Sequence, residues 1–275
     1  MTGVTSSNLL IQERSLRLLV RALKALSASI RTKDLLQSLS PSLFTPLYQQ
    51  WSAHVGAFAS GGLSDASLMH LERALLFLRA LRQLYVYGIG ASTTETEEMV
   101  TFARNCTELV SILVAAVSNP STPEALTSSN SILLRTLRVL GKLLSEYQER
   151  RPYHFVRDAA FGPLMQLILG LLATEGPLAT RHISLEPFLI QILLLCKATM
   201  KSIAYSRPEL KGQFSDVRDR LAALWTDECI TTFAKILLAN YMPLSPGDLT
   251  MWEEDAEEFA SADDSEAWRV IIRVR

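Results

Sequence analysis

Residues 68–82 read LMHLERALLFLRALR, and this stretch decides the fold class. Leucine recurs at positions 68, 71, 75, 78 and 81, whereas charged residues such as Glu72, Arg73 and Arg79 lie between the leucines. Spacings of three and four residues place the leucines on one face of an α-helix and the charges on the other face. The stretch is therefore predicted to be an amphipathic helix whose leucine face is buried.

The same pattern returns along most of the chain, around residues 9–26, 133–144 and 221–237. No run alternates with a period of two for long enough to predict a strand. Caps and breakers, such as Ser40-Pro41, Thr94 with Glu97, and Gly176-Pro177, mark helix ends. The pattern predicts eight helices, at about residues 8–29, 41–59, 65–87, 95–118, 123–150, 152–174, 185–205 and 216–241.

Eight long helices with short connections favour a stack of antiparallel helix pairs, because a closed four-helix bundle would use only half of them. We predict an all-α fold, a right-handed superhelical α-solenoid of about four HEAT/ARM-like helix pairs. A globular helical bundle is the alternative. The predicted organisation is a helical-repeat region over residues 1–244, an acidic Trp-containing loop over 245–268, and the start of a further element over 269–275.

The composition excludes several classes of function. The chain has 275 residues, of which 48% are hydrophobic, and 27 Lys and Arg balance 28 Asp and Glu. A net charge of −1 argues against a general nucleic-acid binder. The three cysteines are widely spaced, which indicates neither a disulfide framework nor a Cys-x-x-Cys metal site. The two most apolar runs, Leu164–Leu172 and Phe188–Cys196, are shorter than the roughly 20 residues of a spanning helix, so we expect no membrane insertion.

A search for catalytic and ligand-binding motifs leads to a non-enzymatic prediction. The sequence contains no GxxxxGK[ST], HExxH or GxSxG motif, and Gly88-Ile89-Gly90 follows a helix and resembles a helix terminator. We therefore predict no catalytic residues, no metal site and no cofactor. A helical enzyme would require a deep pocket in which two of His54, His70, His154 and His182 are in contact.

Residues 245–268, SPGDLTMWEEDAEEFASADDSEAW, contain nine acidic residues and no Lys or Arg. In one interpretation this acidic segment is a solvated linker that Leu249, Trp252, Phe259 and Trp268 hold against the helices, where it shields basic residues. In the other it attracts a basic partner by long-range electrostatics. Charge alone favours the linker. The candidate partner-binding residues are Trp252, Glu253, Glu254, Asp255, Glu257, Glu258, Asp263 and Asp264.

The stretch YMPLSPGDLTMWEEDAEEF, Tyr241–Phe259, resembles a signature of the importin-β superfamily of nuclear transport receptors (karyopherins). Leu249–Asp255 is especially similar to the importin-eleven branch. Helical stretches also resemble that branch, and they extend the resemblance over nearly the whole chain. These stretches are Arg21–Leu26, Leu43–Trp51, Leu71–Leu76 and Leu78–Arg82. Ser265–Arg269 matches the tryptophan that follows the acidic loop in that branch. Ala256 stands where the family usually has proline.

The resemblance implies a solenoid of HEAT repeats that binds protein cargo for nuclear import without catalysis. It also implies binding of nuclear pore Phe-Gly repeat proteins and of the small GTPase Ran, in the cytoplasm, the nucleus and at the nuclear pore. The chain resembles an early-middle fragment of such a receptor, and the resemblance implies that the N-terminal domain, which carries much of the Ran-binding surface, lies before Met1. The alternative is a helical-repeat scaffold or adaptor with no transport role.

Overall fold

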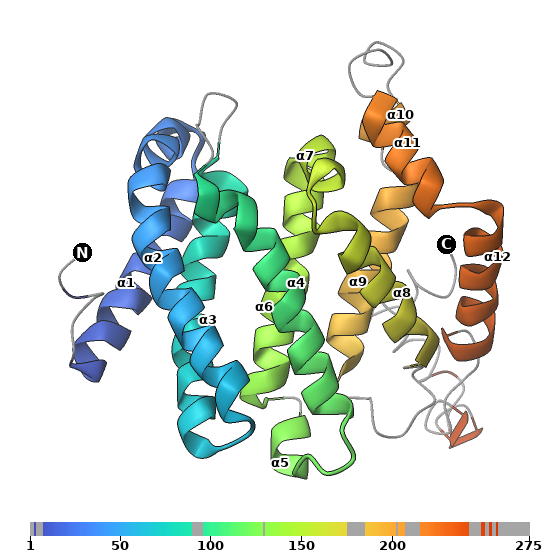
Figure 1. The fold of residues 1–275 in the computed structure, drawn as a ribbon, viewed down its shortest axis with the longest axis horizontal. Helices are drawn as coiled ribbons and strands as arrows, with labels where there is room; N and C mark the ends of the chain where they lie inside the picture. The colour runs from blue at the N-terminus through green and yellow to red at the C-terminus, as the bar shows by residue number, and fades with distance from the viewer. Residues whose placement is uncertain are drawn as a thin grey trace.

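The computed structural model describes residue 3, residues 8–89, 96–128, 130–174, 185–201, 203–206 and 215–241, and positions 249, 250, 253, 254 and 257. Within these residues every element is helical, which confirms the all-α prediction (Figure 1). The α-helices are α1 (Leu9–Ala28), α2 (Lys33–Gly61), α3 (Asp65–Tyr87), α4 (Glu97–Ser118), α5 (Glu124–Thr127), α6 (Ile132–Arg150), α7 (Pro152–Arg157), α8 (Phe161–Thr174), α9 (Glu186–Lys201), α10 (Ile203–Ser206), α11 (Ser215–Leu224) and α12 (Asp227–Ile236). A 3-10 turn, η1 (Ile30–Thr32), precedes α2, and a π-helical turn, η4 (Leu237–Tyr241), follows α12.

The long helices form two layers. Helices α1, α3, α6 and α9 pack in succession and form what we call the B layer, whereas α2, α4 and α8 form the A layer in front of it (Figure 1). The pairs α2–α3, α4–α6 and α8–α9 each contribute one helix to either layer. This repeated pairing is the helical solenoid that the periodicity predicts.

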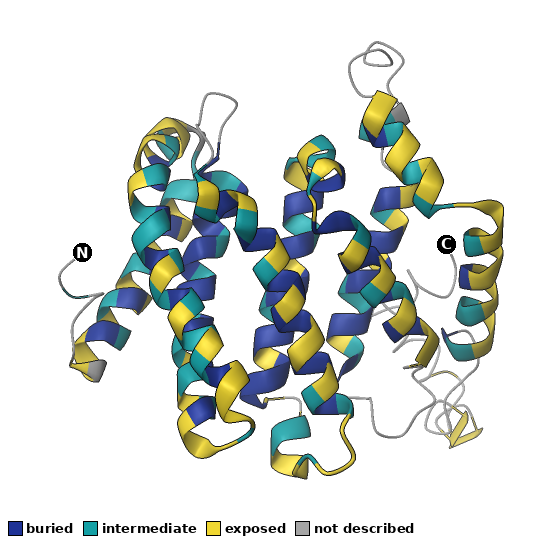
Figure 2. Ribbon diagram, viewed as in Figure 1, coloured by how far each residue is buried: buried dark blue, intermediate teal, exposed yellow. Residues whose placement is uncertain are grey.

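Helix α6 illustrates why the sequence folds in this way. The Ser131 hydroxyl accepts a hydrogen bond from the Leu134 amide at 3.4 Å and so caps the helix N-terminus. Leu133, Leu137, Leu140 and Leu144 repeat at helical spacing, and all four are at most 1% exposed. The side of α6 that faces the A layer is accordingly buried (Figure 2). The apolar face of each B-layer helix thus supplies the core.

The Ser40-Pro41 pair does not begin a helix, which corrects the predicted start of the second helix. Helix α2 begins at Lys33 and continues through Pro41 and Pro46. Leu36 is fully buried, so tertiary packing holds the turn before Pro41 in the helix although proline removes a backbone donor. The Ser40 hydroxyl donates to the Leu36 carbonyl at 2.7 Å. Gly88 ends α3 against Ser40, where a Cβ would lie 1.7 Å from the Ser40 hydroxyl, so only glycine fits there.

Three predicted helices are divided in the structure, and each break has a capping residue. Ser131 separates α5 from α6, and Thr226 caps α12 after α11. Asp158 follows α7, and its carboxylate accepts from the Ala160 amide at 2.9 Å before α8. The predicted helix at 185–205 is helical in its described residues, as α9 and α10, and position 202 lies outside them. Helix α4 begins after Thr96, whose hydroxyl accepts from the Met99 amide, whereas the predicted cap Thr94 and the Gly176-Pro177 breaker lie outside the described residues.

A continuous series of aromatic contacts, which we call the aromatic ladder, joins the helix pairs. Phe102 of α4 lies 5.2 Å from Trp51 of α2 and 5.0 Å from Tyr85 of α3, between ring centroids. Tyr85 lies 4.9 Å from Tyr147 of α6. The series then reaches Phe155 of α7 and Phe161 of α8 at 5.3 and 5.6 Å. Most of these rings meet edge to face, an arrangement that stabilises buried aromatic pairs.

By length and composition alone, α4 could cross a membrane. Ten of its residues are buried, and it packs against α2, α6 and α8. The same features are expected of the core helix of a helical stack, and this placement accounts for its apolar character.

Candidate functional site

Most of the acidic segment lies outside the described residues, including Trp252, Asp255, Glu258, Asp263 and Asp264. Glu253, Glu254 and Glu257 are helical and exposed. Leu249, one of the predicted anchors, is 47% exposed. The partner-binding role of this segment therefore stays a prediction.

Charge is distributed unequally between the two layers. The B-layer helices α1, α3, α6 and α9 carry 13 Lys and Arg against 6 Asp and Glu. The A-layer helices α2, α4 and α8 carry 2 basic residues against 4 acidic ones. Nine of the 13 basic side chains of the B layer are exposed, because the apolar faces of both layers point into the core. The outer surface of the B layer is the electropositive side of the molecule.

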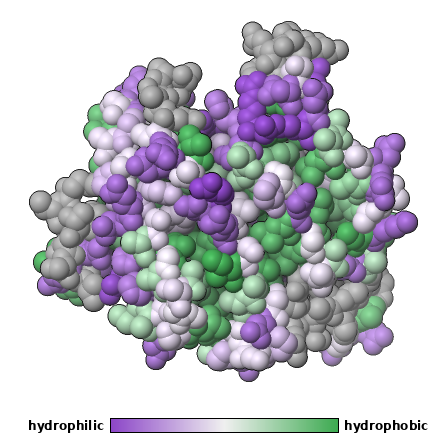
Figure 3. Space-filling model, viewed as in Figure 1, coloured by the Kyte–Doolittle hydropathy of each residue, from purple (hydrophilic) through white to green (hydrophobic). Residues whose placement is uncertain are grey.

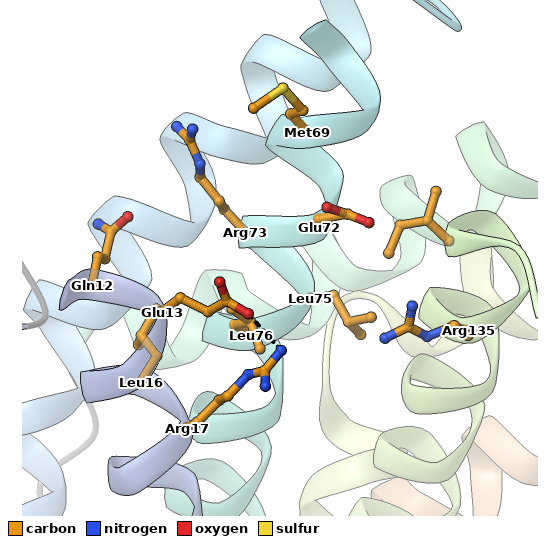
Figure 4. Close-up of a pocket in the computed structure, with 11 residues that line it drawn as sticks. Gln12, Glu13, Leu16, Arg17, Met69, Glu72, Arg73, Leu75, Leu76 and Arg135 are labelled. Atoms are coloured by element: carbon orange, nitrogen blue, oxygen red, sulfur yellow. Dashed lines mark ion pairs between the residues drawn. The ribbon is translucent and has the colours of Figure 1, made fainter. Parts of the chain in front are cut away.

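A pocket of about 310 Å³ opens on the B layer between α1, α3 and α6. Buried leucines, Leu16 and Leu75, form its floor, and charged side chains surround them (Figure 4). We call it the B-layer pocket. It is lined by Gln12, Glu13, Leu16, Arg17, Met69, Glu72, Arg73, Leu75, Leu76, Ile132 and Arg135.

Three arginines and two glutamates form the charged rim of the B-layer pocket. Arg17 and Arg135 extend toward α3 from α1 and α6 (Figure 4). Arg79 of α3 adjoins them: its pKa is lowered by burial and by the positive charges of Arg135 and Arg17. Arg17 forms an ion pair with Glu13 at 2.5 Å. Within the described part of the chain, neither Arg79 nor Arg135 has a carboxylate partner.

An ion pair that does not line the pocket connects α3 and α6 of the B layer. Arg82 of α3 donates two hydrogen bonds to the Glu146 carboxylate of α6, at 2.8 and 2.7 Å. The two side chains are only 12% and 16% exposed. This bidentate pair holds the C-terminal halves of α3 and α6 together.

Comparison with known proteins shows which proteins this chain resembles in sequence. The chain is 25% identical to Importin-11 from Homo sapiens and from Mus musculus over 277 aligned positions, which cover 95% of this chain. The chain is related to the importin-β family. It spans 27% of the length of these curated relatives. No protein-family model matches the chain, and no solved structure does.

The importin relationship confirms the resemblance of the sequence to that family. It extends over both layers, since 95% of the chain is aligned. The B-layer pocket therefore lies within the related region.

The A-layer surface of this importin relative differs from the B-layer surface. Hydrophobic residues gather over α8 and the nearby part of α4 (Figure 3). Between α2 and α4 the surface is closed by polar contacts, in which Asn105 donates to the Tyr48 hydroxyl at 2.6 Å and Thr45 donates to Glu98 at 3.2 Å. The apolar part of the A layer is thus centred on α4 and α8.

Two of the four histidines are in contact. The Nδ1 atoms of His54 and His70 lie 3.0 Å apart, and the His54 ring stacks on Phe77 at 5.8 Å. Neither histidine lines the B-layer pocket, so the deep histidine pocket that an enzyme would require is not formed there.

Among the described residues, no group of three or more His, Cys, Asp or Glu side chains has a metal-binding arrangement. The buried Cys196 has its pKa raised to about 12 by burial, and it remains a thiol at neutral pH.

The histidine pair predicts a pH dependence of stability. Burial, the neighbouring His70 and the charge of Arg73 lower the pKa of His54 from 6.5. The unfolded chain therefore binds a proton at a higher pH than the folded chain, and the free energy of unfolding falls as the pH drops below about 6.5. We expect His54→Gln to lose less stability than the natural chain between about pH 7.5 and pH 5.5, as measured by urea denaturation. Equal losses in both proteins would contradict the prediction.

The pocket arginines were not predicted as a site. Arg17, Arg73 and Arg135 occur in three different amphipathic helices, where each is typical of a solvated helix face. The available signal was the excess of basic residues on those helices. This excess indicates a shared basic surface only when it is known that the helices lie next to one another in the same layer.

Proposed function

We propose that this chain is a protein-binding part of an importin-type nuclear transport receptor. The observation that carries the proposal is the alignment with Importin-11, which covers 95% of a chain folded as stacked helix pairs. Such stacks present long surfaces from both layers, and repeat proteins use these surfaces to bind other proteins. The proposed activity is binding, without catalysis and without a cofactor.

In this proposal each layer has its own partner. Protein cargo lies along the B layer, where polar and charged side chains cover the helices. Phe-Gly repeat proteins of the nuclear pore dock on the A layer, where apolar residues gather over α4 and α8 (Figure 3). The complete receptor responds to Ran and moves between cytoplasm and nucleus through the nuclear pore.

The acidic segment has a separate role in the proposal. Trp252, Glu253, Glu254, Asp255, Glu257, Glu258, Asp263 and Asp264 contact basic segments of cargo. Of these, Glu253, Glu254 and Glu257 are exposed, as such contacts require. Charge reversal of Glu253, Glu254 and Glu257 is expected to reduce pull-down of basic cargo and to spare neutral cargo. Unchanged recovery of both would leave the solvated-linker interpretation.

Binding of Phe-Gly repeats tests the proposed transport role. The full chain is immobilised and incubated with a Phe-Gly repeat fragment, and a fragment with serine in place of phenylalanine is the control. A transport receptor is expected to retain the first and not the second. Equal retention of the two fragments, or of neither, would favour the scaffold or adaptor, which needs no affinity for pore proteins.

A further inference from the structure

Helices α11 and α12 and the π-helical turn η4 form what we call the C-terminal unit, residues 215–241. The unit lies at the end of the stack opposite to α1, where α11 packs against α7 and α12 against α8 (Figure 1). It buries three residues, Val217, Phe233 and Tyr241, whereas α6 alone buries eleven. Apolar packing therefore holds the C-terminal unit less firmly than it holds the helices of the two layers.

Polar side chains attach the C-terminal unit to the end of α7. Arg157 of α7 donates two hydrogen bonds to the Asp216 carboxylate of α11, at 2.6 and 2.7 Å. Arg220 of α11 donates to the carbonyls of Val156 and Arg157, at 3.2 and 2.8 Å. The last carbonyls of a helix have no partner within that helix, so Arg220 satisfies acceptors that α7 leaves open.

The attachment to α8 is of the same kind. Asn240 donates to the Ala173 carbonyl at 3.3 Å, and the Tyr241 hydroxyl donates to the Leu172 carbonyl at 3.4 Å. Both carbonyls belong to the last turn of α8, where intrahelical partners are absent. The C-terminal unit is thus held at two helix ends, at α7 through α11 and at α8 through η4.

Ring contacts connect the helices of the C-terminal unit to each other. Trp225, directly after α11, lies 5.7 Å from Phe233 of α12, between ring centroids. The aromatic ladder, as far as the described rings show it, ends at Phe161 of α8. The ladder and the Trp225–Phe233 pair therefore stabilise two separate groups of helices, which favours movement of α11 and α12 together.

We propose that the C-terminal unit undocks reversibly from α7 and α8 as a whole, while the aromatic ladder keeps the two layers folded. The ion pair between Arg157 and Asp216 makes this undocking sensitive to ionic strength, because the side chains are 40% and 49% exposed and are screened by salt. A rise in salt shifts the equilibrium toward the undocked state.

Undocking also has a consequence for the acidic segment. Residues 245–268 follow η4 in the chain, so release of the C-terminal unit extends the distance over which their carboxylates can reach a basic partner. This consequence rests on the proposed function, because it presumes that the acidic segment binds cargo. The undocking itself rests on the contacts with α7 and α8 alone.

Hydrogen–deuterium exchange of the full chain, read by mass spectrometry at low and at high salt, tests the proposal. Amides of α11 and α12 are expected to exchange about threefold faster at high salt, whereas those of α3 and α6 keep their rates. Asp216→Asn is expected to accelerate both α11 and α12 about threefold at low salt and to remove most of the salt dependence. Asp219→Asn is the matched control, because Asp219 is an exposed aspartate on the same helix.

A second pair of variants tests whether the unit moves as a whole. Asn240→Ala removes a hydrogen bond between η4 and α8, and it is expected to accelerate exchange in α11 as well, although the hydrogen bond lies at the other end of the unit. Leu238→Ala is the control, because Leu238 belongs to the same turn and is 60% exposed.

Faster exchange of α11 and α12 together, with α3 and α6 unchanged, supports the proposal. Salt-independent exchange in the natural chain, acceleration confined to the helix or turn that carries the substitution, or equal effects of Asp216→Asn and Asp219→Asn would overturn it. A rise in exchange of all helices together would also overturn it, because the C-terminal unit would then open only when the whole stack unfolds. The measurement contains neither pore protein nor cargo, so its failure leaves the proposed transport role standing.

Discussion

Replacing Phe102 with alanine is expected to lower the free energy of unfolding by about 3–5 kcal/mol. Phe102 is fully buried, and its ring contacts Phe44, Trp51 and Tyr85 at centroid distances of 5.4, 5.2 and 5.0 Å. Removal of the ring leaves a cavity where three helices meet, and the rigid neighbouring rings cannot fill it. Urea denaturation followed by circular dichroism measures the loss.

Val100→Ala is the matched control for this prediction. Val100 lies on the same helix, half a turn away, and is 58% exposed. Its truncation is expected to change the free energy of unfolding by less than about 0.5 kcal/mol. Similar losses in the two variants would mean that the aromatic ladder does not stabilise the stack.

Replacing Glu146 with alanine is expected to cost about 2–3 kcal/mol, because Arg82 keeps its charge in a site that is mostly removed from water. The side chains of Arg82 and Glu146 are 12% and 16% exposed, so solvent screens the pair only in part. The measurement is again urea denaturation, at low and at moderate salt.

Two controls separate this effect from a general loss of charge. Glu13→Ala removes the exposed partner of Arg17 and is expected to cost less than about 0.5 kcal/mol, because these side chains are 44% and 66% exposed. The double variant Arg82→Met, Glu146→Leu removes both charges and is expected to recover most of the stability. If Glu146→Ala behaved like Glu13→Ala, the ion pair between α3 and α6 would not stabilise the stack.

The periodic leucines were sufficient to predict the helices and their stacking. Leu71, Leu75 and Leu78 are buried, as their spacing requires. The errors arose where tertiary packing opposed a local signal. Pro41 indicates a helix start, but burial of Leu36 extends α2 through it. Ser131 and Thr226 carry the capping signals that divide longer apolar runs, and these signals are visible in the sequence.

The candidate site was less predictable than the fold. Arg73 and Arg135 are 62 residues apart, and they line one pocket because α3 and α6 are neighbours in one layer. The spacing of apolar and charged residues indicates which face of each helix is polar. It does not indicate which polar faces lie on the same surface of the folded chain. The Trp-acidic stretch, by contrast, was recognisable because its residues are contiguous.

The aromatic ladder has a consequence for how the molecule responds to force and heat. Ring contacts pass from α2 to α4, then through α3 to α6, and through α7 to α8, so separating neighbouring helix pairs breaks at least one edge-to-face contact. The three pairs are therefore expected to melt in one cooperative transition instead of fraying pair by pair. Edge-to-face rings can also tilt by small amounts while staying in contact. The whole stack can therefore change its curvature without losing these contacts.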